Sequence, residues 1–137
     1  MRLHHLGIAS LDIEKTKRSM QLLYPGAQAG ETVYDPLQEA FLCLLKISDG
    51  TVFEIVCSEQ AKKIARCGFC VYHICMETAH FDRTMEKWLL SGYDLISAPK
   101  PAVLFGGKRV AFWRTEAGLV ELLEAESGEQ RENTGRS

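Results

Sequence analysis

The order of hydrophobic patterns along this chain repeats once, and that repeat constrains the fold more than any other feature of the sequence. Residues 3–10 alternate like a β-strand, and residues 11–23 carry apolar side chains at helical spacing. Three further strand patterns follow, at roughly 27–34, 39–47 and 51–58. The same order of strand, helix and three strands then begins again, which predicts a duplicated architecture.

The second copy of the pattern fixes the expected fold class. Its segments are a strand over 69–77, a helix over 79–91 and strands near 93–97, 109–114 and 119–124. Asp12 precedes the first helix and is its predicted N-cap. We therefore expect an α+β fold, in which two tandem βαβββ modules form a curved mixed sheet around a cleft.

The same patterns predict the domain boundaries. Module one covers residues 1–58, a short polar helical connector covers 59–68, and module two covers 69–125. We expect residues 1–125 to form one domain. The last segment, 126–137, is polar and has no apolar period, so it is predicted to be a disordered tail.

Composition excludes several classes of partner. A net charge of −2 and a pI near 6.1 argue against a general nucleic-acid-binding protein, which would need a basic surface. No apolar run approaches the roughly 20 residues that span a bilayer. The N-terminal residues lack the apolar region of a signal peptide. We expect a soluble cytoplasmic protein that binds neither nucleic acid nor membrane.

Two histidines and two glutamates occupy equivalent places in the two halves. His5 and Glu54 are 49 positions apart, His73 and Glu121 are 48 apart, and each His precedes its Glu by three strands. One imidazole and one carboxylate from each half can therefore converge, and such a set suits Zn, Ni, Co, Mn or Fe(II). We predict that these four residues bind one divalent metal ion.

Strand periodicity supports this ligand set. Each of the four polar residues lies in a row of apolar residues that share its face of a strand. Polar groups in such rows are costly unless they are paired, and a shared cation would pair all four. His4 is the main rival to His5, because neighbouring strand residues point to opposite faces. Alignment of residues 3–7 with 71–75 favours His5, and His80 is expected at the surface or as a helix cap.

Four segments occur in an order and spacing that resembles the vicinal oxygen chelate superfamily. Residues 3–9 are similar to its first strand, 52–56 to its fourth and 72–77 to its fifth. Residues 106–112, followed by 118–124, are similar to the closing segment of methylmalonyl-CoA epimerases. The resemblance spans about residues 3–124 and is nearest to glyoxalase I and these epimerases. Glu54 looks more like glyoxalase I, since such epimerases often carry Gln there.

The resemblance implies a metal-dependent isomerase, epimerase or lyase, and a homodimer. Its substrate would be a small oxygenated acid or acyl (thio)ester that passes through an enolate stabilised by a Lewis acid. Glu121, by transient detachment, and Glu39 are the candidate bases. Candidate substrate-binding residues are Lys108 and Arg109, which follow two glycines, and the aromatic residues Phe105 and Trp113. The alternatives are a non-catalytic small-molecule-binding protein of the same fold and an extradiol dioxygenase.

Overall fold

The computed structural model describes residues 1–125, so the tail predicted for 126–137 lies outside the described residues. The chain divides into two compact units. The first unit is His5–His73, and the second contains Met1–His4 and, of the described residues, 74–125. The boundary passes through β1 (Arg2–Ala9) and β6 (Val71–Thr78), the opening strands of the two predicted modules.

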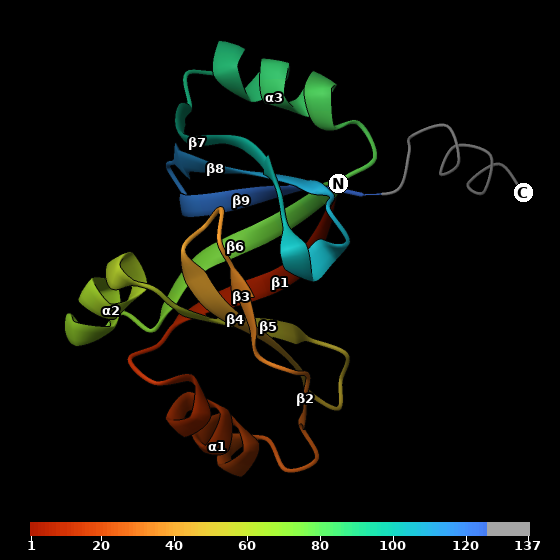
Figure 1. Ribbon diagram of the computed structural model, residues 1–137. Coiled ribbons are helices and arrows are strands. Elements are labelled where there is room, and N and C mark those ends of the chain that lie inside the picture. The colour runs from red at the N-terminus through yellow and green to blue at the C-terminus, as the bar shows by residue number, and fades with distance from the viewer. Residues whose placement is uncertain (126–137) are drawn as a thin grey trace, which may run out of the picture. The chain divides into compact units, whose positions relative to one another are not determined.

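The first unit contains a mixed sheet with one helix packed along it. Its strands after β1 are β2 (Gln28–Ala29), β3 (Val33–Asp35), β4 (Ala40–Lys46) and β5 (Val52–Cys57). β5 pairs in parallel with β1 and antiparallel with β4. Helix α1 (Ile13–Leu23) lies along β4 and β5 (Figure 1) and buries Ile13 and Met20 against Cys43, Leu45 and Ile55. A second helix, α2 (Glu59–Arg66), follows β5 and agrees with the predicted helical connector.

The edge of this sheet differs from the prediction. The single strand expected over 27–34 is two short strands, β2 and β3, which both pair with β4. Ala29 pairs with Leu45 and Val33 pairs with Leu42. The edge segment therefore advances four residues while β4 advances three. One extra residue at this point is a β-bulge, which interrupts the pairing and splits the edge strand.

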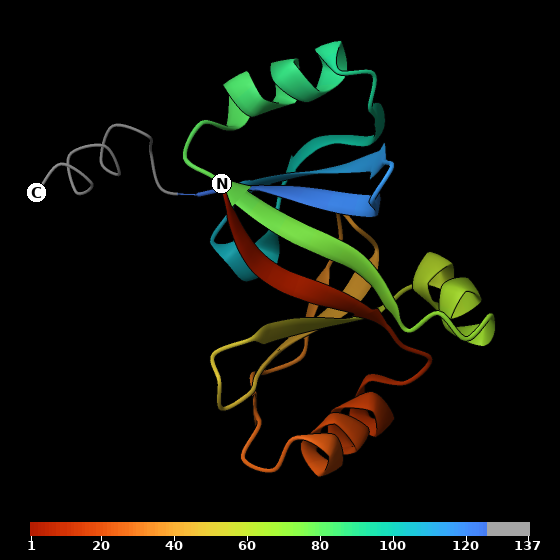
Figure 2. The same ribbon diagram turned by 180° about the vertical axis from the view of Figure 1, so that it is seen from behind.

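The second unit repeats this arrangement. After β6 come α3 (Phe81–Leu90), β7 (Asp94–Pro101), a 3₁₀ turn (Val103–Phe105), β8 (Arg109–Thr115) and β9 (Gly118–Glu124). The strand order is β6–β9–β8–β7, with β9 parallel to β6 and antiparallel to β8. Helix α3 covers β8 and β9 (Figure 2), and its Phe81 packs with Ala111, Trp113 and Leu122. The predicted α+β class with two βαβββ modules is therefore confirmed.

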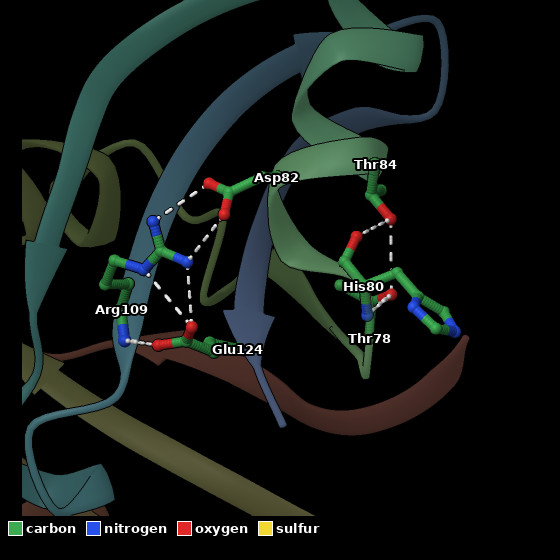
Figure 3. Close-up of polar contacts among 6 residues, drawn as sticks. All are labelled: Thr78, His80, Asp82, Thr84, Arg109 and Glu124. Atoms are coloured by element: carbon green, nitrogen blue, oxygen red, sulfur yellow. Dashed lines mark hydrogen bonds and ion pairs between the residues drawn. The ribbon is translucent and has the colours of Figure 1, made fainter. Parts of the chain in front are cut away.

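Helices α1 and α3 begin in the same way. Ser10 Oγ contacts Thr16 Oγ1 and accepts a hydrogen bond from Asp12 N, and 68 positions later Thr78 Oγ1 contacts Thr84 Oγ1 and accepts from His80 N (Figure 3). Asp12 caps α1 as predicted, because its carboxylate accepts from Lys15 N. Within residues 1–125, no helix is long and apolar enough to cross a membrane.

Candidate metal centre

Three of the four predicted ligands converge in the first unit. The Nε2 atoms of His5 and His73 are 3.2 Å apart, and Glu54 Oε1 is 3.6 Å from the first and 3.7 Å from the second. All three residues are buried, with 1%, 2% and 4% of His5, His73 and Glu54 exposed. The sequence prediction that these side chains would meet is supported by this geometry.

Gly7 makes the convergence possible. It pairs with Glu54 across the parallel β1–β5 ladder and lies two residues from His5, on the same face of β1. A Cβ built on Gly7 would overlap the imidazole ring of His73. The ring therefore occupies the space that any larger residue would fill. A glycine inside a strand often marks such a close approach, and that was the available sequence signal for this residue.

The three donor atoms fit a divalent cation better than a hydrogen-bonded cluster. The Glu54 oxygen lies beyond hydrogen-bond distance from both imidazole nitrogens. Two donors that each bond one ion at about 2.1 Å with tetrahedral geometry lie about 3.4 Å apart, close to the three observed separations. Two imidazoles and a carboxylate also match the donor preferences of Zn, Co, Ni, Mn and Fe(II). A single ion would bring each donor within bonding range, whereas a shared proton would join only the two imidazoles.

Glu121, the fourth predicted ligand, lies in β9 of the second unit and is 1% exposed. It pairs with Cys75 across the parallel β6–β9 ladder. In each module the glutamate is thus opposite the residue two places after the histidine, as Glu54 is opposite Gly7. The equivalence that the sequence counts indicated is therefore an equivalence of strand register.

The residues paired directly across from Glu54 and Val56 in the first unit are aliphatic. Leu44 is the antiparallel partner of Glu54, and Val56 is paired with Leu42, which is paired with Val33. Paired residues share a face of the sheet, so these aliphatic side chains lie on the same face as the carboxylate. Leu42 and Val56 are buried.

The Glu121 face of the second unit carries a different set. Phe112 pairs with Glu121 and with Ser97, while Val110 pairs with Leu123 and with Lys100. Sequence analysis missed Phe112. The signal was the short turn between β8 and β9: Thr115 pairs with Gly118, and continuing that antiparallel register places Phe112 opposite Glu121.

Trp113, a predicted substrate-binding residue, lies on the opposite face of β8 from Phe112. It is 1% exposed and packs in the cluster under α3, with its ring edge-on to Trp88 at 5.7 Å between centroids. This position favours a core role for Trp113. Its predicted contact with substrate stays a prediction without support from the packing.

Arg109, another predicted substrate-binding residue, holds an ion-pair cluster (Figure 3). Its Nη1 donates to Asp82 Oδ1 at 2.9 Å, its Nη2 donates to Glu124 Oε2 at 2.8 Å, and its guanidinium lies 4.5 Å from the Phe81 ring centroid. Hydrogen bonds from Arg109 lower the pKa of both carboxyl groups, and these bonds raise the pKa of Arg109 itself. A substrate anion would compete with two protein carboxylates for this group, so a substrate role of Arg109 stays a prediction.

The remaining candidates are placed as follows. Phe105 packs against the buried cluster of Cys75, Ala102, Val110 and Leu123, and the ring of His4 lies edge-on to it at 5.1 Å. Lys108 is exposed in the loop before β8. Glu39 ends the turn between β3 and β4, with a positive φ of 50°. The roles predicted for these residues stay predictions.

Comparison with known families agrees with the resemblance seen in the sequence. Residues 4–112 match the model of the Glyoxalase/Bleomycin resistance protein/Dioxygenase superfamily. The chain therefore belongs to this superfamily, which is the vicinal oxygen chelate group named above. No curated protein matches the sequence.

Solved structures with the same fold include epimerases. A hypothetical protein from Bacillus halodurans matches with a TM-score of 0.76 and 21% identity, covering 92% of this chain and 95% of that one. Methylmalonyl-CoA epimerase from Mycobacterium tuberculosis matches at 0.74 and 16%, covering 96% and 91%. The Streptomyces coelicolor methylmalonyl-CoA epimerase in complex with 2-nitronate-propionyl-CoA matches at 0.72 and 25%, covering 91% and 97%.

Proposed function

We propose that this protein is a metal-dependent isomerase, epimerase or lyase that acts on a small oxygenated acid or acyl (thio)ester through an enolate. The observation that carries this proposal is the convergence of His5 Nε2, His73 Nε2 and Glu54 Oε1 at separations suited to one cation. We infer that Glu121 is the fourth ligand, because its place in the second module repeats that of Glu54 in the first.

The proposed reaction breaks a C–H bond next to a carbonyl group. When bound, the metal ion would supply a Lewis acid for the negative charge that develops on the substrate oxygen. Glu121, by transient detachment, is the proposed base: its carboxylate takes the proton from carbon and returns it to the same or the neighbouring carbon. Glu39 is the second candidate base.

Other properties follow from the family rather than from the site. We infer that the protein is a homodimer in the cytoplasm and that its partner is a small molecule. Sedimentation of the purified protein tests the dimer. A protein that sediments only as a monomer would contradict it.

Metal analysis tests the centre. The purified protein should bind about one equivalent of a divalent metal when offered Zn, Co, Ni or Mn. His5→Ala, His73→Ala and Glu121→Ala should each lose it, while Glu116→Gln, in the exposed turn before β9, should keep it. A wild-type protein that takes up none of these metals would instead favour the non-catalytic binding protein.

Exchange of hydrogen for deuterium tests the chemistry. The metal-loaded protein in deuterated water should exchange the α-hydrogen of a 2-substituted acyl compound, as measured by NMR. Glu121→Gln should remove the exchange, because the amide cannot accept the proton. Absence of exchange across a panel of acids, esters and thioesters, in a protein that binds metal, would contradict enolate formation.

A further inference from the structure

The duplicated sheet provides an internal control for each residue around the two glutamates. Residues 67 or 68 positions apart occupy equivalent places in the two units. Leu44 pairs with Glu54 as Phe112 pairs with Glu121. Leu42 and Val110 pair with the residues two places after the glutamates. The edge strands follow the same rule, since Val33 pairs with Leu42 and Lys100 with Val110. The edge strand of each unit shifts register just before this place, ahead of Val33 in the first unit and ahead of Lys100 in the second.

Lys100 is the exception in this comparison. Its counterpart in the first unit is the aliphatic Val33, so the strand pattern does not require a charge at this place. The side chain of Lys100 is half-buried. In the part of the chain that the structure describes, no carboxylate forms an ion pair with its ammonium group, although Arg109 on the opposite face has two.

The face on which Lys100 lies is the Glu121 face. Its partner Val110 shares a face with Phe112, the partner of Glu121. The next pair along the ladder, Pro101 with Arg109, points to the opposite face of the sheet. That face is the one toward α3, where Arg109 reaches Asp82. Ser97, which pairs with Phe112, is also half-buried and adds a hydroxyl group on the same face, in the row that contains Glu121.

We propose that Lys100, assisted by Ser97, binds an anionic oxygen group of the substrate, a carboxylate or a phosphonate, and so selects acidic substrates. This inference rests on the proposed function for the reaction that follows binding. β7 and β9 are two strand spacings apart, about 10 Å. A lysine side chain and a substrate with a few heavy atoms between its anionic end and its reacting carbon can together span that distance.

The alternative is that the Lys100 stem only covers apolar surface while its head lies in water. Lys100→Met keeps the stem and removes the charge, so it separates the two roles. Lys100→Arg keeps the charge, and Lys87→Met removes an exposed charge from α3 in the same unit as a matched control. Malonate and phosphonoacetate serve as anionic probes, and malonamide is the neutral analogue of malonate.

Binding of these probes is measured by calorimetry on both metal-loaded and metal-free protein. A charge-assisted bond at this site predicts that Lys100→Met weakens malonate or phosphonoacetate binding about 10- to 100-fold. Malonamide affinity should not change, Lys100→Arg should restore most of the anion affinity, and Lys87→Met should match wild type. Whichever anion loses more affinity identifies the group that is recognised.

Three outcomes would overturn the inference: no anion binding to wild type, equal affinities in wild type and Lys100→Met, or an equal loss for malonamide. The metal-free arm keeps this result separate from the proposed function. If the protein takes up no metal but Lys100→Met still weakens anion binding, the Lys100 site is supported and the proposed metal chemistry is contradicted.

Discussion

The two modules of this protein share a backbone plan but surround their glutamates with different side chains. Strand register, edge bulges and the hydroxyl pairs before the helices recur at an offset of 67 or 68 residues. Leu44 pairs with Glu54 and Val33 lies beyond Leu42, whereas the equivalent places around Glu121 hold Phe112 and Lys100, with Ser97 beyond Phe112. The strand positions of the candidate ligands are the same in the two modules, whereas the residues beside the glutamates differ.

This difference teaches where function is added to a repeated fold. A ligand must keep its strand position, because moving by one residue turns its side chain to the other face. The neighbouring positions on that face need only fill space, so they are free to diverge.

The largest effect should come from the two histidines, and it tests whether the modules contribute equally. His5→Ala and His73→Ala should each weaken metal binding more than about 100-fold, since changing even a residue that orients a ligand costs 10- to 100-fold. Competition with a fluorescent chelator measures both affinities. If either variant binds metal as tightly as wild type, the histidine that it lacks is not a metal ligand.

Gly7 and Cys75 occupy equivalent places and provide a sharper comparison. Gly7→Ala should displace the His73 ring, lower the free energy of unfolding by about 1–3 kcal/mol and weaken metal binding. Cys75→Ala only shortens a buried side chain, and should cost about 1 kcal/mol without a change in metal affinity. Urea unfolding and metal titration measure both. Equal metal affinity in Gly7→Ala and wild type would contradict the role given to the missing Cβ.

The Arg109 cluster lies in the second unit, and acid should test it. Because Arg109 lowers the folded-state pKa of Glu124 and Asp82, its stabilisation is present above their unfolded values and is lost as pH falls through the folded ones. Arg109→Met should lower the melting temperature by about 4 °C at pH 7 and by less at pH 3. The control is Arg114→Met, whose pair with Asp94 is exposed and long. An Arg109→Met deficit that stays constant from pH 7 to pH 3 would exclude these two carboxylates as its cause.

The smallest effects concern the two helix starts. Asp12→Ala should cost about 1 kcal/mol, because the first turn of α1 loses a side-chain acceptor. His80→Asp places the same cap in front of α3 and should stabilise the protein by about 0.5 kcal/mol. Thermal unfolding followed by circular dichroism measures both. Destabilisation by His80→Asp would mean that His80 has a packing role that Asp12 lacks.

The sequence by itself determined the repeat, the fold class and the strand positions of the candidate ligands. These follow from local period: an alternating strand or a helical stripe is visible in a short window, and counting between equivalent residues needs no coordinates. The same reasoning gave the Asp12 cap, which depends on residues three places apart. Membership of the superfamily rested on motifs of the same kind.

Only the tertiary structure decided which face each neighbouring side chain occupies. The bulges in β2–β3 and β7 shift register by one residue, and such a shift changes every later pairing without leaving a clear local signal. Packing between separate segments likewise placed Trp113 under α3 and the His73 ring against Gly7. These contacts join residues distant in sequence, so they depend on the register of the whole sheet rather than on any one segment.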